Sequence, residues 1–202
     1  MIRCPRQLDG QIDHLLAINT VRIELAVGLP PAGGELVWWR SDWELRAHSR
    51  ARTIPDALFA VHWPGIDEQV FALEVEYGTR APRSFQAKLL RYATAGYRRG
   101  IYGETDPIVL VVGRDPSVLA RYRTALAPLA LRVTAGFADL GQIETCGAVG
   151  PVWRSQHGEE CLSLRGLANC CYRENRLTAE TRGESRPCAA GAAHIYPHLA
   201  VR

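Results

Sequence analysis

Lysine is almost absent from the sequence: of 24 basic residues only Lys88 is a lysine, and the others are arginines. Arginine cannot give up its proton, whereas a lysine ammonium is a compact charge whose pKa responds to its surroundings. A lysine that stands alone is therefore a candidate functional residue, although chance can also leave one lysine in a chain of this kind.

The sequence also lacks long apolar runs. No stretch approaches the roughly 20 apolar residues of a membrane-spanning helix, and the first ten residues lack the apolar core of a signal peptide. These absences predict a cytoplasmic protein without membrane contact. The 202 residues, 47% hydrophobic and 22% charged, are typical of a soluble globular protein that can bury a substantial core.

Closely spaced cysteine pairs are absent as well. The six cysteines lie mostly in the last third of the chain, and none forms a Cys-x-x-Cys pair. This pattern predicts neither a disulfide framework nor a zinc ribbon. An alternative metal site would combine Cys161, Cys170, Cys188, His194 and His198. That spacing matches no tetrahedral zinc motif.

Hydrophobic periodicity predicts the order helix, three strands, helix, strand, helix. The first helix covers residues 9–28, in which Ile12, Leu15, Leu16, Asn19, Ile23 and Ala26 recur at helical spacing before Gly28 ends the pattern. The later elements are strands over 35–46, 52–63 and 71–77, a helix over 83–99, a strand over 107–112 and a helix over 115–126. The three consecutive strands resemble an antiparallel meander, and the strand over 107–112 is apolar enough to be buried on both faces.

The end of the chain gives weaker signals. Residues 129–140 predict one more strand at an edge of the sheet, and from residue 141 the sequence is rich in Gly, Cys and Arg with little periodicity. We therefore expect a core domain over residues 9–140, followed over 141–202 by an extension of unassigned structure that is disordered in part.

Two carboxylates share one face of the third predicted strand. Side chains alternate along a strand, so Glu74 and Glu76 lie together with Ala72, opposite an apolar face. One interpretation is the solvent-facing side of a half-buried sheet. The other is the wall of a functional site, and the remaining polar residues bear on that choice.

Asp56 is the polar exception in the second predicted strand, where it shares a face with Ile54 and Leu58. An aspartate there must be paired, solvated or bound to a cation, because burying a lone charge costs several kcal/mol. Further candidates are Glu24 on the first helix, and Lys88 and Tyr92 one turn apart on the next helix. Glu24 is most simply an exposed helix residue, whereas Lys88 and Tyr92 are explained equally well as an amphipathic helix edge.

The order of elements, with Pro55-Asp56 in one strand and Glu74 in the next, resembles the PD-(D/E)XK nuclease-like superfamily. A closer resemblance rests on the motifs HLLAINTVRIEL, IPDALFAV, FALEVEYGT, and KLLRY followed by PIVLVV. In this order they look like the replication-relaxation family of plasmids and mobile elements. The resemblance covers residues 13–140 and rests on the order of short motifs. It implies an α/β (α+β) fold of the restriction-endonuclease type, an αβββαβ core with a mixed central sheet flanked by helices.

The resemblance also implies a mechanism, which is phosphodiester hydrolysis in DNA assisted by Mg²⁺ or Mn²⁺. Asp56 and Glu74 would hold the cation, and Lys88 would stabilise charge that develops on the phosphate. Glu76 would be an additional ligand, and Glu24 and Tyr92 would support the site.

One departure from the nuclease motif leaves two outcomes open. The motif expects a lysine two residues after the strand acid, and this chain has Glu76 there. Either Lys88 replaces the missing lysine from the following helix, or the site is degraded and the domain binds DNA in replication control without cutting it.

Members of the family often carry a winged-helix segment ahead of this core, and we expect none ahead of the first helix here. DNA contact is therefore expected from the arginines around the site, which are Arg80, Arg83, Arg91, Arg98 and Arg99. Such charges bind phosphate without reading sequence, and they can equally form a solvated helix face.

Other partners stay open in the sequence. A second copy of the chain, as in a homodimer, and other replication or mobile-element proteins are candidates. A third class of function is a protein-interaction module with Trp38, Trp39, Trp43 and Trp63 as an exposed anchor. Tryptophans in adjacent strands are more often part of a core, because large aromatic side chains dominate buried area.

Overall fold

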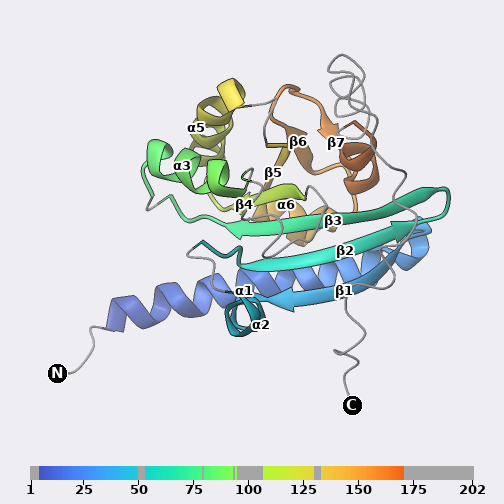
Figure 1. Ribbon diagram of the computed structural model, residues 1–202, viewed down its shortest axis with the longest axis horizontal. Helices are drawn as coiled ribbons and strands as arrows, with labels where there is room; N and C mark the ends of the chain where they lie inside the picture. Colours follow the sequence, from blue (N-terminus) through green and yellow to red (C-terminus); the bar gives the residue numbers. More distant parts are fainter. Residues whose placement is uncertain are drawn as a thin grey trace.

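One seven-stranded sheet with the order β1-β2-β3-β4-β5-β6-β7 organises the computed structural model, which describes residues 5–49, 53–78, 80–92, 94, 107–129 and 133–170 (Figure 1). The strands are β1 (Glu35–Ser41), β2 (Ala57–Trp63), β3 (Ile66–Val75), β4 (Ile108–Gly113), β5 (Ala135–Asp139), β6 (Trp153–Ser155) and β7 (Cys161–Leu162). The helices are α1 (Pro5–Gly28), α2 (Asp42–His48), α3 (Pro82–Tyr92), α5 (Pro116–Leu126) and α6 (Leu140–Cys146), with 3-10 turns η1 (Pro30–Ala32) and η2 (Ala127–Leu129).

The sheet is mixed. Strands β1, β2 and β3 form an antiparallel meander, β3, β4 and β5 run parallel, and β6 and β7 return antiparallel. The predicted mixed α/β architecture, with helices flanking a central sheet and a meander followed by a helix and a strand, is confirmed. No helix within the described residues is long and apolar enough to cross a membrane.

Each face of the sheet has its own hydrophobic core. On one face Leu73 and its neighbours pack against Val21 and Leu25 of α1. On the other face Ala72 lies with Phe85 of α3 and Tyr122 of α5, whose rings stack at 4.2 Å between centroids. Because side chains alternate along β3, the residue after Leu73 points toward α3 rather than toward solvent.

Helix α1 presents a different side to the sheet from the one that the pattern suggested. Its buried residues are Ala17, Val21 and Leu25, whereas the stripe that predicted the helix is solvent-exposed, with Leu16 and Ile23 each more than half exposed. Both sides of α1 are therefore apolar. Periodicity identifies such a helix but does not select its buried side.

Two predicted elements have different limits. The segment predicted as one strand over 35–46 divides at Ser41, where β1 ends and α2 begins. The Ser41 N–H donates to Glu44 Oε2 at 2.7 Å, which is half of a capping box, and this local bond stabilises a helix start. Strand β3 ends at Val75, so Glu76 lies just beyond it. The predicted helix over 83–99 is described only as far as Tyr92 and residue 94.

The sheet extends beyond the predicted core domain of residues 9–140. Strand β6 pairs with β5, and Trp153, Leu164 and Leu167 are fully buried in the core beside α1 and α6. The buried Gln156 side chain also connects this segment to β5 and the residues before it. It accepts from the Ala135 N–H at 2.8 Å and donates to the Val133 carbonyl at 2.9 Å. Residues 141–170 thus belong to the same folded unit, and residues 171–202 lie outside the described part.

Candidate functional site

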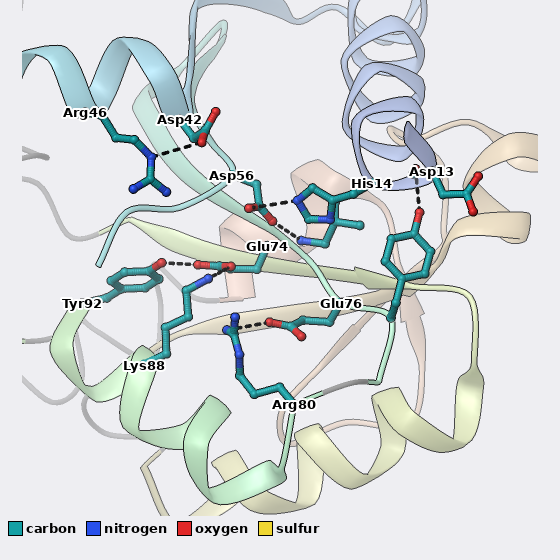
Figure 2. Close-up of polar contacts among 12 residues, drawn as sticks. Asp13, His14, Asp42, Arg46, Asp56, Glu74, Glu76, Arg80, Lys88 and Tyr92 are labelled. Atoms are coloured by element: carbon teal, nitrogen blue, oxygen red, sulfur yellow. Dashed lines mark hydrogen bonds and ion pairs between the residues drawn. The ribbon is translucent and has the colours of Figure 1, made fainter. Parts of the chain in front are cut away.

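The candidate site lies where β2 begins and β3 ends. Ala57 of β2 pairs with Leu73 of β3, and the ladder continues one step further because the Asp56 N–H donates to the Leu73 carbonyl at 3.0 Å. Asp56 and Glu74 therefore stand at neighbouring positions on adjacent strands. Figure 2 shows their side chains together with Lys88 and Tyr92 of α3.

Glu74 is the buried centre of this group. Its side chain has no exposed surface, and its two carboxylate oxygens accept hydrogen bonds from Lys88 Nζ and from the Tyr92 hydroxyl. Burial raises the pKa of Glu74 to about 7, the Lys88 charge opposes the rise, and the Asp56 charge adds to it. The interpretation of the Glu74 face as a solvent-facing side is therefore wrong.

Helix α3 delivers Lys88 and Tyr92 to this acid. Phe85 and Leu89 are both fully buried against the sheet, which fixes the rotation of the helix about its axis. Lys88 and Tyr92 are four residues apart, so they project from the same side of the helix onto Glu74. The lone lysine of the chain is thus an ion-pair partner of the strand acid, as Figure 2 shows.

Asp56 is held at both of its carboxylate oxygens. Oδ2 accepts from the Val75 N–H at 2.7 Å, and Oδ1 lies 3.2 Å from His14 Nε2. Burial alone would raise the pKa of Asp56, but the His14 contact, the Lys88 charge and the Val75 N–H outweigh it, so the pKa is lowered. Asp56 is accordingly ionised near neutral pH.

His14 is a site residue that the sequence did not identify. The hydrogen bond to Asp56 raises the pKa of His14, while burial of the ring acts in the opposite direction. His14 lies one turn before Ala17, on the buried side of α1. A histidine on that side would have been a usable signal, but only after the exposed stripe had been recognised as exposed.

A second acid and base lie beside these residues. Glu76, only 5% exposed, accepts from Arg80 NH1 at 2.9 Å. Burial raises the pKa of Glu76, and the Arg80 charge opposes that rise. The Arg80 carbonyl accepts from the Tyr122 hydroxyl at 2.8 Å, which holds this arginine against α5. We call the whole group, His14, Asp56, Glu74, Glu76, Arg80, Lys88 and Tyr92, the central cluster.

The other predicted residues are not gathered in the central cluster. Glu24 lies ten residues beyond His14 on α1, about 15 Å along the helix axis. It faces Gly147, on which a Cβ would lie 3.5 Å from Glu24 Oε2. Arg83 and Arg91 are exposed on α3, and Arg91 donates to Thr53 Oγ1 at 3.0 Å. Arg98 and Arg99 lie outside the described residues.

The predicted tryptophan anchor is mostly inside the fold. Trp63 has no exposed surface, and Trp39 stacks on Phe59 with 5.1 Å between ring centroids. The Trp38 indole donates to Glu68 Oε1 at 3.1 Å. Only Trp43, which is 67% exposed, is a large exposed member of this set. The four side chains therefore do not form one exposed surface.

The central cluster contains the right donor type for a divalent cation, since Mg²⁺ and Mn²⁺ prefer carboxylate oxygens. The oxygens of Asp56 and Glu74 are already paired, however, with His14, the Val75 N–H, Lys88 and Tyr92. Among the described residues no three acids, histidines or cysteines are arranged to hold a metal ion. These residues fit a cation in their chemistry, but the cation would compete with Lys88 for Glu74.

The acids and bases of the central cluster are paired without an added ion. Three carboxylates, Asp56, Glu74 and Glu76, face three bases, His14, Lys88 and Arg80. Each acid has its own base, and Tyr92 adds a neutral donor to Glu74. The arrangement is therefore a paired ionic group where the inner strand β2 begins and β3 ends, partly open to solvent at its His14, Asp56 and Arg80 side chains.

Comparison with known protein families identifies the family of this chain. The sequence model described as replication-relaxation matches residues 5–106, which is half of the chain and includes every described residue of the central cluster. No curated protein and no solved structure gives a significant match. The chain therefore belongs to the replication-relaxation family, and this membership suggests a role in the replication of plasmids or other mobile elements.

Proposed function

We propose that the protein acts on DNA during plasmid or mobile-element replication, and that the central cluster is a nuclease-like centre that hydrolyses a phosphodiester bond. The observation that supports this is the meeting of Asp56, Glu74 and Lys88. They come from three separate elements, and the contacts of α3 with the sheet place Lys88 on Glu74. These are the residues that a nuclease with a relocated lysine requires.

The residues of the centre differ in how far their side chains are exposed to solvent. The Glu74 side chain is fully buried, whereas Asp56 and Lys88 keep 19% and 15% of their side-chain surface exposed. Asp56 is thus the carboxylate that a water molecule or a cation can reach. In the metal-free centre Glu74 orients the Lys88 ammonium group, whose charge can stabilise a phosphate in the transition state.

Mg²⁺ or Mn²⁺ is the cation that this proposal expects. Asp56 and Glu74 would hold it, with Glu76 nearby. When bound, such an ion polarises the phosphate and lowers the pKa of an attacking water. Such an ion would compete with Lys88 for Glu74, whereas Asp56 could keep its contact with His14, because a carboxylate oxygen has two lone pairs.

The complete pairing of Asp56 and Glu74 favours a second candidate function, which is DNA binding in replication control without cleavage. A centre whose charges are already neutralised needs no cation to be stable. Glu76 at the usual lysine position agrees with this alternative. In both cases the exposed Arg83 and Arg91 on α3 would contribute phosphate contacts that weaken with salt.

The test is cleavage of labelled single- and double-stranded oligonucleotides with Mg²⁺, Mn²⁺ or EDTA. Asp56→Asn and Lys88→Met should lower the rate about 100-fold or more, because each removes a group that acts on the phosphate. Asp42→Asn is the matched control, since Asp42 pairs with Arg46 on the exposed side of α2.

The outcomes separate the two functions. Cation-dependent cutting that Asp56→Asn and Lys88→Met abolish, and Asp42→Asn leaves intact, supports the nuclease. Salt-sensitive DNA binding without cutting by any protein rejects hydrolysis and supports the binding function. Equal cutting by wild type and Asp56→Asn would assign the activity to another site or to a contaminant.

A further inference from the structure

Helix α1 reaches the central cluster through one side chain, His14. The residue it contacts, Asp56, has a backbone that is fixed on both sides. The Asp56 N–H donates to the Leu73 carbonyl at 3.0 Å, and the Asp56 carbonyl accepts from the Asp42 N–H at 3.1 Å. Only the rotation of the Asp56 side chain is left to be set by other contacts.

Two contacts set that rotation. The Val75 N–H donates to Asp56 Oδ2 at 2.7 Å, and His14 Nε2 lies 3.2 Å from Asp56 Oδ1. A single hydrogen bond leaves a carboxylate free to turn about the bonded oxygen, whereas donors on both oxygens define its plane. Val75 belongs to β3 and His14 to α1, so the carboxylate contacts the sheet through one oxygen and the helix through the other.

His14 is itself held in place. The Tyr77 hydroxyl donates to the Asp13 carbonyl at 2.7 Å, and the Tyr77 ring lies 6.2 Å from the His14 ring between centroids. Ala17 and Val21 anchor the next two turns of α1 in the core. Figure 2 shows the His14 ring directed toward Asp56. The donor to Asp56 therefore stands on a rigid support.

We propose that His14 is a positioning residue of the nuclease-like centre, which holds the Asp56 carboxylate in the orientation that faces Glu74 and Lys88. This inference rests on the proposed function for its catalytic meaning. The competing explanation is that the His14–Asp56 contact only stabilises the packing of α1 against the sheet. If the contact only stabilises packing, its loss lowers the free energy of unfolding alone. If His14 positions Asp56, the loss also changes the orientation of the Asp56 carboxylate and the reaction rate.

Three variants separate these explanations. His14→Gln keeps an N–H donor at a similar reach, and His14→Phe keeps a ring but removes the donor. His62→Phe is the matched control, because His62 is exposed on β2 and pairs with Glu35 at the opposite end of the strand. Melting temperatures of all three proteins show whether each remains folded.

The first readout is the amide resonance of Val75 in a proton–nitrogen correlation spectrum, because this N–H is bonded to Asp56 Oδ2. We expect His14→Phe to move the resonance well beyond the change in His62→Phe, and His14→Gln to restore most of it. The second readout is DNA cleavage, where His14→Phe should lower kcat about 10-fold or more with little change in KM.

The results can overturn the inference without reference to cleavage. An unchanged Val75 resonance in folded His14→Phe would show that Asp56 keeps its orientation without His14. Failure of His14→Gln to restore the resonance would also reject the role of the donor. The Val75 resonance could move in His14→Phe and return in His14→Gln although the wild type cuts no DNA. That result would support the positioning of Asp56 by His14 and reject hydrolysis. Failure of the inference and failure of the proposed function are therefore distinguishable.

Discussion

Two acid–base pairs of this protein have the same chemistry and opposite surroundings. The Asp42–Arg46 pair on α2 joins Arg46 Nε to Asp42 Oδ2 at 3.3 Å, with 43% of the Asp42 side chain and 62% of the Arg46 side chain exposed. The Glu74–Lys88 pair lies beneath α3, with the Glu74 side chain fully buried and 15% of the Lys88 side chain exposed. Both appear in Figure 2.

The difference in surroundings decides what each pair can do. Exposed pairs contribute about 0–1 kcal/mol, since water and salt screen them. A buried pair gives each partner a large effect on the other, because neither charge can turn to solvent instead. The Glu76–Arg80 pair is intermediate, with a buried acid and an arginine side chain that is 36% exposed. Graded substitutions along this series test the comparison.

The largest expected effect is that of Lys88→Met. The change leaves the Glu74 carboxylate buried without its base, so we expect a loss of about 3–5 kcal/mol in the free energy of unfolding at pH 9, where the wild-type acid is ionised; at pH 7 the acid takes up a proton and the loss is smaller. Urea unfolding followed by circular dichroism measures it, with Arg46→Met as the exposed control. A loss below about 1 kcal/mol would mean that Lys88 and Glu74 do not depend on each other.

The next effect is a dependence of stability on pH. The pKa of Glu74 is raised from 4.5 to about 7, so folding takes up a proton between these values and stability falls as the pH rises through them. The expected fall is roughly 3 kcal/mol. His14, whose pKa is raised above 6.5, adds a further fall above that pH. Asp56, whose pKa is lowered from 3.8, contributes stability that is lost only in stronger acid.

Glu74→Gln checks the assignment of this pH dependence. An amide does not titrate, so the fall between pH 4.5 and pH 7 in urea unfolding series should become smaller, and the part due to Glu76, whose pKa is also raised, should remain. Asp42→Asn should keep the wild-type slope. The assignment to Glu74 is rejected if the slope is the same in Glu74→Gln and wild type.

A smaller effect is expected from Arg80→Met. Glu76 would lose the donor at its Oε1, but water can take the place of the Arg80 side chain, which is 36% exposed, so we expect a loss of about 1–2 kcal/mol in the free energy of unfolding at pH 7. Thermal unfolding with the same Arg46→Met control measures it. An effect as large as that of Lys88→Met would place Glu76, rather than Glu74, at the energetic centre of the cluster.

The smallest effect is expected from Asp42→Asn, at about 0.5 kcal/mol or less, because the pair with Arg46 is exposed on both sides. Urea unfolding in low and high salt measures it, and the small difference from wild type should shrink further in high salt. A loss above about 1 kcal/mol would remove the contrast between exposed and buried pairs.

The sequence could predict the parts of the fold that depend on local pattern. The meander, the buried strand β4 and the Asp115 cap of α5 follow from alternation, apolar runs and turn residues; the Ser117 N–H donates to Asp115 Oδ1 at 2.8 Å. Asp56, Glu74 and Lys88 could be chosen because each is a polar exception in an apolar pattern or, for Lys88, the lone residue of its type.

Features that depend on tertiary packing could not be predicted. The buried side of α1 was not identifiable because Leu16 and Ile23 make the exposed side as apolar as the side that packs. His14 was missed for the same reason. The folding of residues 141–170 rests on short strands and on Gln156, whose side chain bonds to the backbone of distant residues, and periodicity does not detect such contacts.

Nicking of supercoiled plasmid DNA is the measurement that tests the nuclease-like centre most directly, because a single cut per molecule converts the plasmid to the open circle. With Mg²⁺ or Mn²⁺, we expect wild type and Asp42→Asn to nick the plasmid, and Asp56→Asn and Lys88→Met to leave it supercoiled. The claim is contradicted if wild type leaves the plasmid supercoiled at concentrations that saturate binding, or if Asp56→Asn nicks it at the wild-type rate.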